Sequence, residues 1–123
     1  MDKRPVNLDL ATVKFPITAI ASITHRVTGV VLLGAVLVLL WLLGTSIESE
    51  EGFNFVRSIL ATLPVKLLMW AMLSALIYHV FAGLRHLVMD LGFWESLGGG
   101  KLSARLMMVI SGVFILLAGV WLW

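Results

Sequence analysis

The chain contains no cysteine, and only 13% of its 123 residues are charged. Without cysteine it cannot by itself form a disulfide, a zinc–thiolate site or a thiolate-held iron–sulfur cluster. Soluble domains have about a quarter of their residues charged, whereas this chain is 60% hydrophobic. The composition therefore predicts an integral membrane protein.

Basic residues are few and scattered, and the formal net charge is only +2. Binding of nucleic acid requires clustered Lys and Arg, so we expect no nucleic-acid partner. The basic N-terminus, Met1 to Pro5, is not followed directly by an apolar run, and the first long run has no small-residue cleavage site at its end. We therefore expect no removable signal peptide.

The chain has only three prolines, and two of them, Pro16 and Pro64, stand directly before long apolar runs. Proline suits the first turn of a helix, and about 20 mostly apolar residues are enough to cross a bilayer. We predict an all-α integral membrane protein with three transmembrane helices in an up-down bundle, over residues 22–44, 65–90 and 103–123. The anchor as a whole comprises residues 17–123, and residues 1–16 form an extended or short-helical arm on the cytoplasmic side.

The two loops of this bundle differ in character. The first contains three Glu and then an amphipathic segment from Phe53 to Leu63, which we expect to lie along the membrane interface. The second, residues 92–101, contains Gly98, Gly99 and Gly100, and we expect a flexible turn there. No internal repeat or second domain is visible.

Lys and Arg are unevenly divided between the two ends of the predicted helices. One end has only Arg57 and Lys66, whereas the N-terminal arm and the second loop together have Lys3, Arg4, Lys14, Arg26, Arg85, Lys101 and Arg105. By the positive-inside rule the N-terminus and the second loop are cytoplasmic.

The second apolar run contains ionisable side chains. His79, Gly83, His86 and Asp90 have spacings of 4, 3 and 4 and so fall on one stripe of a helix, while Arg85 points elsewhere. An ionisable group inside a membrane helix costs about 2.5 kcal/mol or more, so the stripe predicts a site. Gly83 leaves space between the two imidazoles for a flat group.

A second polar group lies at the cytoplasmic end of the first helix. Ser22 and Arg26 are four residues apart and share a helix face, with His25 beside them. We expect these residues on the same side of the membrane as His86 and Asp90. His79 should lie deeper than His86, by roughly 10 Å at about 1.5 Å per residue.

Imidazole is a common axial ligand of haem iron, and His79 is the candidate because of its depth. Two histidines seven residues apart on one helix cannot bind opposite faces of one iron. With three histidines in the chain, the pattern favours one b-type haem shared with a partner chain. His25 and His86 would then lie near the haem propionates, and Arg26 or Arg85 would neutralise them.

Simpler interpretations stay open at each of these positions. A histidine in a membrane helix can hydrogen-bond to a neighbouring helix, and a serine can bond to its own backbone. The arginines fit the ordinary positive-inside pattern, and the glycines fit close helix packing. The competing class is a non-redox membrane accessory subunit whose polar stripe binds a partner helix or relays protons.

Two stretches of the chain resemble the cytochrome b subunit of succinate dehydrogenase (succinate:quinone oxidoreductase, respiratory complex II). The first is the RPV of residues 4–6 followed, from Ser22 to Gly29, by SITHRVTG. The second, from His79 to Gly92, is HVFAGLRHLVMDLG. The three-helix layout extends the resemblance over the whole chain, with no departure at the motif positions.

The resemblance implies a membrane-anchor subunit that passes electrons from succinate to ubiquinone, in the tricarboxylic acid cycle and the respiratory chain. It implies that His79 ligates the iron of one haem b, shared with a second small membrane-anchor subunit that supplies the other histidine. It also implies that His25 and Arg26 approach the haem propionates, and that Ser22 and Arg26 help to form the ubiquinone pocket.

The same resemblance implies that an iron–sulfur subunit and a flavoprotein dock on the cytoplasmic face. Succinate is oxidised on the flavoprotein, so this chain would have no catalytic residue for that step. We expect a multi-pass protein of the bacterial inner (cytoplasmic) membrane, in contact with lipid. Fumarate reductases use related anchors, so the direction of electron flow stays open.

Overall fold

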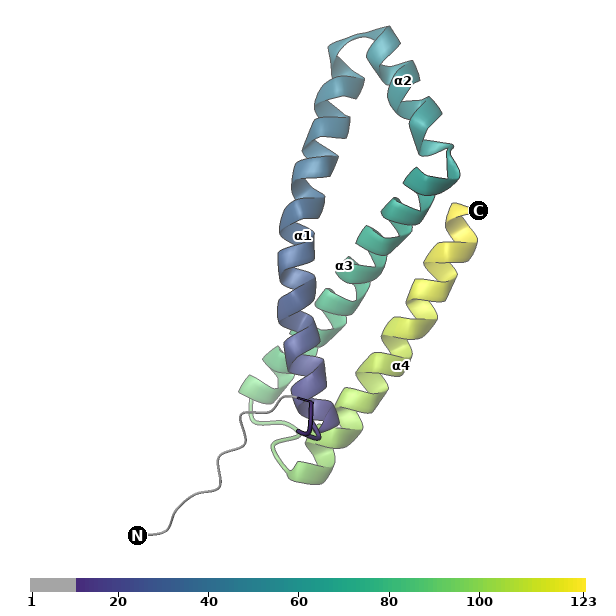
Figure 1. Ribbon diagram of the computed structural model, residues 1–123. Helices are drawn as coiled ribbons and strands as arrows, with labels where there is room; N and C mark the ends of the chain where they lie inside the picture. Colours follow the sequence, from purple (N-terminus) through teal and green to yellow (C-terminus); the bar gives the residue numbers. More distant parts are fainter. Residues whose placement is uncertain (1–10) are drawn as a thin grey trace.

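The computed structural model describes residues 11–123, which form four α-helices and no β-strand. These are α1 (Ile17–Glu48), α2 (Glu50–Leu60), α3 (Leu63–Asp90) and α4 (Leu97–Leu122) (Figure 1). Three of them, α1, α3 and α4, are long and apolar enough to cross a membrane. The predicted all-α fold with three such helices is confirmed. Residues 1–10, most of the expected N-terminal arm, lie outside the described part.

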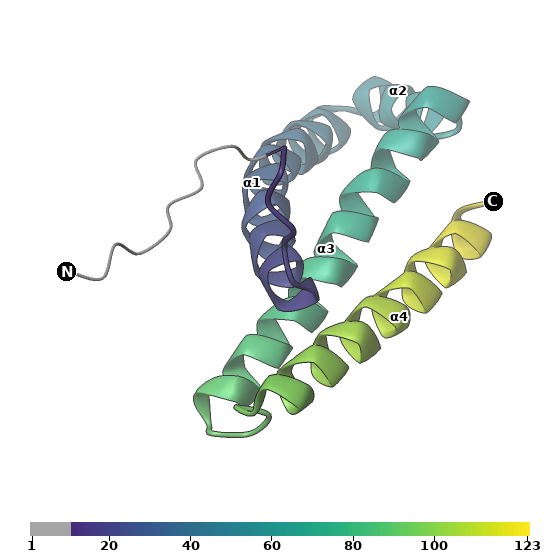
Figure 2. The ribbon, with the colours of Figure 1, turned by 60° about the horizontal axis from the view of Figure 1, so that its bottom comes forward.

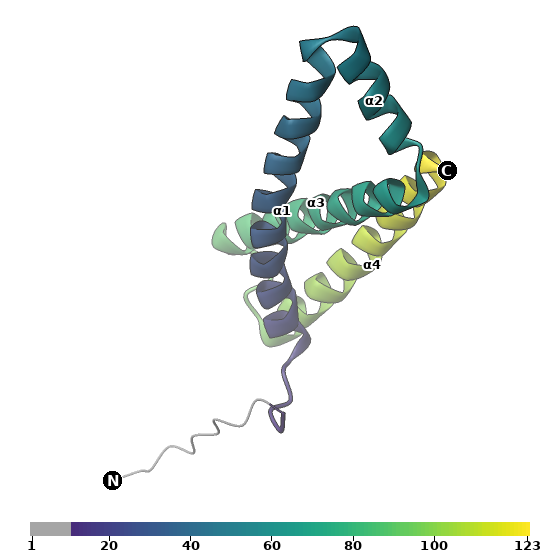
Figure 3. The same cartoon turned by 45° about the horizontal axis from the view of Figure 1, so that its top comes forward.

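The helices α1 and α3 cross near one end of the molecule and diverge toward the other, where α2 connects them (Figures 1 and 3). Helix α4 runs beside α3 in the opposite direction (Figures 1 and 2). The start of α1, the end of α3 and the start of α4 therefore lie at the same end of the bundle. This end contains the polar residues that the sequence singles out.

Small residues bring the helices together at this end. Ala21 of α1, Ala82 of α3 and Ala104 of α4 are almost completely buried, and they pack with Met107 in one cluster. In a bilayer, small side chains allow helix backbones to approach closely, which favours packing by van der Waals contact. The crossing also brings the hydroxyl of Tyr78 within 3.2 Å of the Ala21 carbonyl, to which it donates a hydrogen bond.

The amphipathic segment of the first loop is a helix, and it begins at Glu50 rather than at Phe53. Ser49 caps it, since its Oγ accepts a hydrogen bond from the Gly52 amide at 3.0 Å. Glu50 and Glu51 lie in its first turn and Arg57 in its last. Both placements match the helix macrodipole, which favours acidic residues at the N-terminus and basic residues at the C-terminus.

The prediction of a flexible turn over residues 92–101 is wrong for the second half of that segment. Helix α4 begins at Leu97, so the three glycines form its first turn. The Oγ of Ser96 caps this turn by accepting a hydrogen bond from the Gly99 amide at 3.0 Å. A Cβ on Gly99 would lie only 2.9 Å from that Oγ and 3.3 Å from the Cα of Trp94. Here glycine permits a close approach and does not confer flexibility.

Arg85 joins α3 to the start of α4. It is only 6% exposed, and its Nε donates to Ser103 Oγ at 3.0 Å while its Nη2 donates to the Gly100 carbonyl at 3.1 Å. These bonds attach the first two turns of α4 to α3. They also show that Arg85 points away from the stripe of His79 and His86, as predicted.

Candidate functional site

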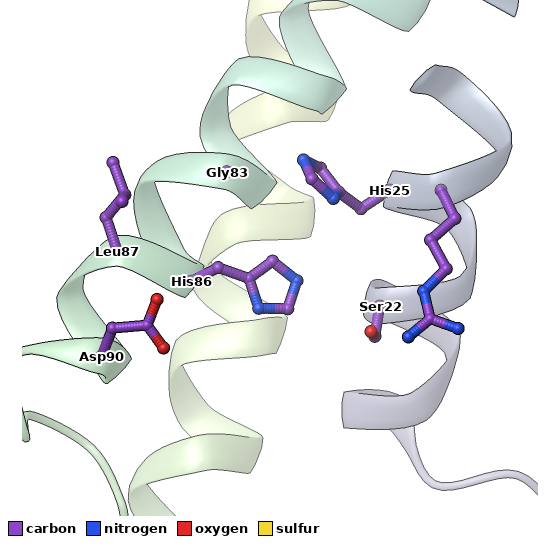
Figure 4. Close-up of a pocket in the computed structure, with 7 residues that line it drawn as sticks. Ser22, His25, Gly83, His86, Leu87 and Asp90 are labelled. Carbon is purple, nitrogen blue, oxygen red and sulfur yellow. The ribbon is translucent and has the colours of Figure 1, made fainter. Parts of the chain in front are cut away.

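A pocket of about 520 Å³ opens between α1 and α3 at the end of the bundle where they cross. Its lining comes from two helices: Ser22, His25 and Arg26 from α1, and Gly83, His86, Leu87 and Asp90 from α3. Figure 4 shows His86 and Asp90 extending from α3 toward α1, with Ser22 and His25 opposite them. A hydroxyl, a guanidinium, two imidazoles and a carboxylate thus surround one space.

Helix geometry explains why these residues meet. Ser22 and Arg26 are one turn apart on α1, and Gly83, His86 and Asp90 follow one stripe of α3. The crossing of α1 and α3 turns the two stripes toward each other. The pocket stays open on one side, since Arg26 and Asp90 are both exposed to the surroundings.

The three histidines form a cluster. The ring of His25 stacks on that of His79, with centroids 4.1 Å apart and planes 13° from parallel, and its centroid lies 5.2 Å from the tilted ring of His86. The sequence placed His25 at the cytoplasmic end of the first helix and His79 deeper than His86. The crossing of α1 and α3 brings the His25 ring into contact with both.

The sequence predicted that Gly83 leaves space for a flat group between two imidazoles. In the structure the imidazole of His25 lies beside Gly83. A Cβ at Gly83 would lie 3.4 Å from His25 Nε2, so the ring that approaches this glycine comes from α1 of the same chain. His79 does not line the pocket and lies behind His25. The pocket therefore contains the predicted residues Ser22, His25, Arg26 and His86, and His79 is its neighbour.

One nitrogen of His79 is fixed by α1. Its Nδ1 lies 3.1 Å from the His25 carbonyl oxygen and 3.1 Å from Thr28 Oγ1, while Thr28 Oγ1 itself donates to the His25 carbonyl at 2.8 Å. A carbonyl oxygen only accepts, so Nδ1 must be the protonated nitrogen and Nε2 carries the lone pair. Within residues 11–123, Nε2 makes no hydrogen bond.

This arrangement is the one that prepares a histidine to bind a metal, because a carbonyl that accepts the N–H of one ring nitrogen orients the other and makes it more basic. The donor chemistry of His79 therefore fits haem iron. In residues 11–123, no group of three or more His, Cys, Asp or Glu side chains is placed to hold a metal ion. His79 offers one ligand nitrogen of the kind that haem iron takes.

Thr28 is the residue that sequence reasoning missed. It is buried, and its hydroxyl links His25 to His79 across the helix crossing. Its signal was present in the sequence: a hydroxyl three residues after His25, on the same face of the helix, within an otherwise apolar run. The alternative role of Arg85, neutralising carboxylates on the histidine side, is wrong for this chain because its bonds are with α4.

The comparisons with known proteins all indicate the same family. Residues 1–122 match the family described as succinate dehydrogenase/fumarate reductase transmembrane subunit. The succinate dehydrogenase cytochrome b556 subunit of Coxiella burnetii is 48% identical over 122 residues, which cover 98% of each chain. The subunit of the same name from Paracoccus denitrificans is 32% identical over 118 residues, covering 93% of this chain and 88% of that one.

A succinate dehydrogenase cytochrome b560 subunit from Reclinomonas americana is 30% identical over 120 residues, covering 94% of this chain and 83% of that protein. The matches cover most of this chain and most of each relative, so they concern the whole fold and not one motif. The resemblance predicted from two stretches of sequence is confirmed.

Proposed function

The chain belongs to the succinate dehydrogenase/fumarate reductase transmembrane subunit family, and on that premise we propose that it is the cytochrome b subunit of a bacterial succinate:ubiquinone oxidoreductase. It is a multi-pass membrane protein with three spanning helices. As a succinate dehydrogenase subunit it assembles with a flavoprotein and an iron–sulfur protein. We place it in the inner membrane, with the pocket end of the bundle facing the cytoplasm.

His79 would bind the iron of one haem b, which supplies a one-electron carrier within the membrane. The support for this assignment is the bonding of Nδ1 to the His25 carbonyl and Thr28 hydroxyl, which leaves Nε2 as the ligand atom. A second small anchor subunit would contribute the other axial histidine. His25, Arg26 and His86 would hold the haem propionates, since all three line the pocket beside His79.

Ser22 and Arg26 would bind ubiquinone. A quinone carbonyl oxygen gains negative charge as it is reduced, and donors directed at that oxygen stabilise the charge. The hydroxyl of Ser22 and the guanidinium of Arg26 are such donors, and they line the same space one helical turn apart. The observation on which this proposal rests is their convergence in a pocket that opens beside the histidine cluster.

The experiment compares Ser22→Ala and Arg26→Leu with the unchanged complex in two assays. Loss of one hydrogen bond to a charged oxygen is worth about 1.5 to 3 kcal/mol, so succinate:ubiquinone activity should fall roughly tenfold to a hundredfold. Succinate oxidation by a soluble dye acceptor should persist, because the flavoprotein is unaffected. The dye assay separates the membrane site from succinate oxidation.

The matched control is Ser46→Ala, at the far end of the same helix. Its hydroxyl, bonded to the Leu43 carbonyl at 2.9 Å, lines no part of the pocket, so both activities should be unchanged. If the Ser22 and Arg26 variants lost both activities in parallel with the amount of assembled complex, the two residues would be structural and the quinone site would lie elsewhere.

A further inference from the structure

The hydroxyl of Thr28 lies where α1 meets the imidazole of His79. It donates a hydrogen bond to the His25 carbonyl of its own helix at 2.8 Å, and its oxygen lies 3.1 Å from His79 Nδ1 on α3. Thr28 is buried, with 9% of its surface exposed. It does not line the pocket of Ser22 and Arg26, so contact with quinone does not explain its position.

The bond to the His25 carbonyl fixes the direction of this hydroxyl. Threonine is β-branched, and in a helix its Oγ1 commonly bonds to the carbonyl three or four residues earlier. A hydroxyl has one proton, and in Thr28 the His25 carbonyl accepts it. Because that proton is already used, Thr28 Oγ1 can only accept a hydrogen bond from His79 Nδ1.

The Nδ1–H group of His79 is therefore shared between two oxygens. The His25 carbonyl oxygen and Thr28 Oγ1 each lie 3.1 Å from Nδ1, as in a three-centre hydrogen bond, where one N–H has two acceptors. Each acceptor draws the proton away from the ring, which makes the imidazole more electron-rich and Nε2 a stronger ligand atom. The hydroxyl of Thr28 thus acts on Nε2 from the opposite side of the ring.

Two further contacts hold this ring against α1. The ring of His25 stacks on one face of His79, with centroids 4.1 Å apart. A Cβ at Gly29 would lie 3.3 Å from His79 Cε1, so the helix also approaches one edge of the ring closely. Because these contacts do not involve the Thr28 hydroxyl, its removal should change the electron density of the imidazole more than the position of the ring.

We propose that Thr28 is a positioning residue that acts through His79, and that its hydroxyl, by accepting from Nδ1–H, lowers the reduction potential of the haem iron. The proposal rests on the haem assignment made above. The couple concerned is the one-electron reduction of ferric to ferrous haem. Ferric iron has one more positive charge, so a more electron-rich imidazole stabilises it more than ferrous iron, and hydrogen bonding behind the ligand is a known means of setting such a potential.

The test is a redox titration of the haem absorbance in the intact complex with variants at position 28. Thr28→Val keeps nearly the shape of threonine and lacks the hydroxyl. Its ferric-to-ferrous equilibrium should shift toward ferrous haem by up to about tenfold, which is a rise of about 59 mV for a one-electron couple. Haem should also be bound roughly tenfold more weakly. Thr28→Ser keeps the hydroxyl and should keep both the potential and the affinity.

A second variant separates the hydroxyl from the packing. Thr28→Ala also lacks the hydroxyl but is smaller than valine, so a rise in potential common to both variants follows from the lost acceptor and not from side-chain volume. The matched control is Thr24→Val, one helical turn earlier on α1. The Thr24 hydroxyl bonds to the Ile20 carbonyl at 2.7 Å, a backbone bond of the same kind, so its loss should leave the potential unchanged.

The possible outcomes distinguish this proposal from the haem assignment. An unchanged or lowered potential in Thr28→Val or in Thr28→Ala would overturn the role of Thr28, and so would an equal rise in Thr28→Ser. If His79→Leu lost the low-spin spectrum while Thr28→Val kept its potential, the haem assignment would stand without this role. If His79→Leu kept the spectrum of the unchanged complex, His79 would not be the ligand and both would fail.

Discussion

His79 is held at one nitrogen and open at the other, and this asymmetry is the most informative feature at the scale of single residues. The Nδ1 contacts with the His25 carbonyl and Thr28 Oγ1 fix both the tautomer and the ring orientation. The geometry leaves Nε2 available for the ligand role proposed for His79.

Replacing His79 by leucine removes the imidazole without adding charge. We expect the complex to lose haem b or its low-spin bis-histidine absorption spectrum, because one axial ligand is gone. His86→Leu, on the same helix, is the control and should keep the low-spin spectrum, since it would lose only a contact near the propionates. If His79→Leu kept the low-spin spectrum and His86→Leu lost it, His86 and not His79 would be the axial ligand.

Sequence reasoning found most residues of the site but not their contacts. The stripe of Gly83, His86 and Asp90 follows from helical periodicity alone, and all three line the pocket. The stacking of His25 on His79 could not be predicted, because it depends on the angle at which α1 and α3 cross. The same holds for Arg85, whose direction away from the stripe was predictable but whose partners on α4 were not.

At the scale of elements, the glycines show how position decides what a residue does. A Cβ at Gly29 would lie 3.3 Å from His79 Cε1, so this glycine admits the imidazole at the crossing, whereas one at Gly34 would meet nothing within 4 Å. Sequence alone gives both glycines the same interpretation. For Gly98 to Gly100 it predicted a turn, since glycine is a poor helix former, but the Ser96 cap and the bonds to Gly100 outweigh that preference.

The start of α4 can be tested with a pair of alanine substitutions. Gly99→Ala places a Cβ against Ser96 Oγ and the backbone of Trp94, so the cap should be lost at a cost of about 1 kcal/mol. Gly98→Ala meets nothing within 4 Å and should stabilise the helix by up to about 1 kcal/mol. Hydrogen exchange of the first-turn amides of α4 measures both effects.

In Gly99→Ala we expect these amides to exchange faster than in the unchanged chain, and in Gly98→Ala at the same rate or slower. Equal acceleration in both variants would mean that helix propensity is not the controlling factor and that the turn needs glycine at each position. The opposite order would contradict the capped-helix description of this segment.

At the scale of the whole molecule, the chain has a thin core and a large apolar surface. Of residues 11–123, only eight hydrophobic ones are buried, and long side chains on every spanning helix are exposed, including Leu33, Leu87 and Leu116. An apolar hollow of about 460 Å³ is lined by residues such as Leu32 and Met72. Lipid and other subunits must cover these surfaces, which agrees with a subunit of a membrane complex.

The two ends of the molecule differ in charge, and this difference predicts the orientation of the chain. Among the residues that the structure describes, the pocket end of the bundle has Arg26, Lys101 and Arg105, whereas the α2 end has only Arg57 and Lys66. An excess of Lys and Arg near helix ends marks the cytoplasmic side. The pocket should therefore open toward the cytoplasm, where a flavoprotein and an iron–sulfur protein would meet it.

This chain contains no cysteine, so a single introduced cysteine is the one thiol of this chain that a maleimide can label. Glu51→Cys in α2 and Glu95→Cys in the loop before α4 are both at exposed positions, at opposite ends of the bundle. A membrane-impermeant maleimide should label Glu51→Cys in intact spheroplasts. It should label Glu95→Cys only after the membrane is permeabilised and the complex denatured, since docked subunits would otherwise shield it. The reverse pattern would place the pocket on the outer face, where Ser22 and Arg26 could not receive electrons from a cytoplasmic flavoprotein.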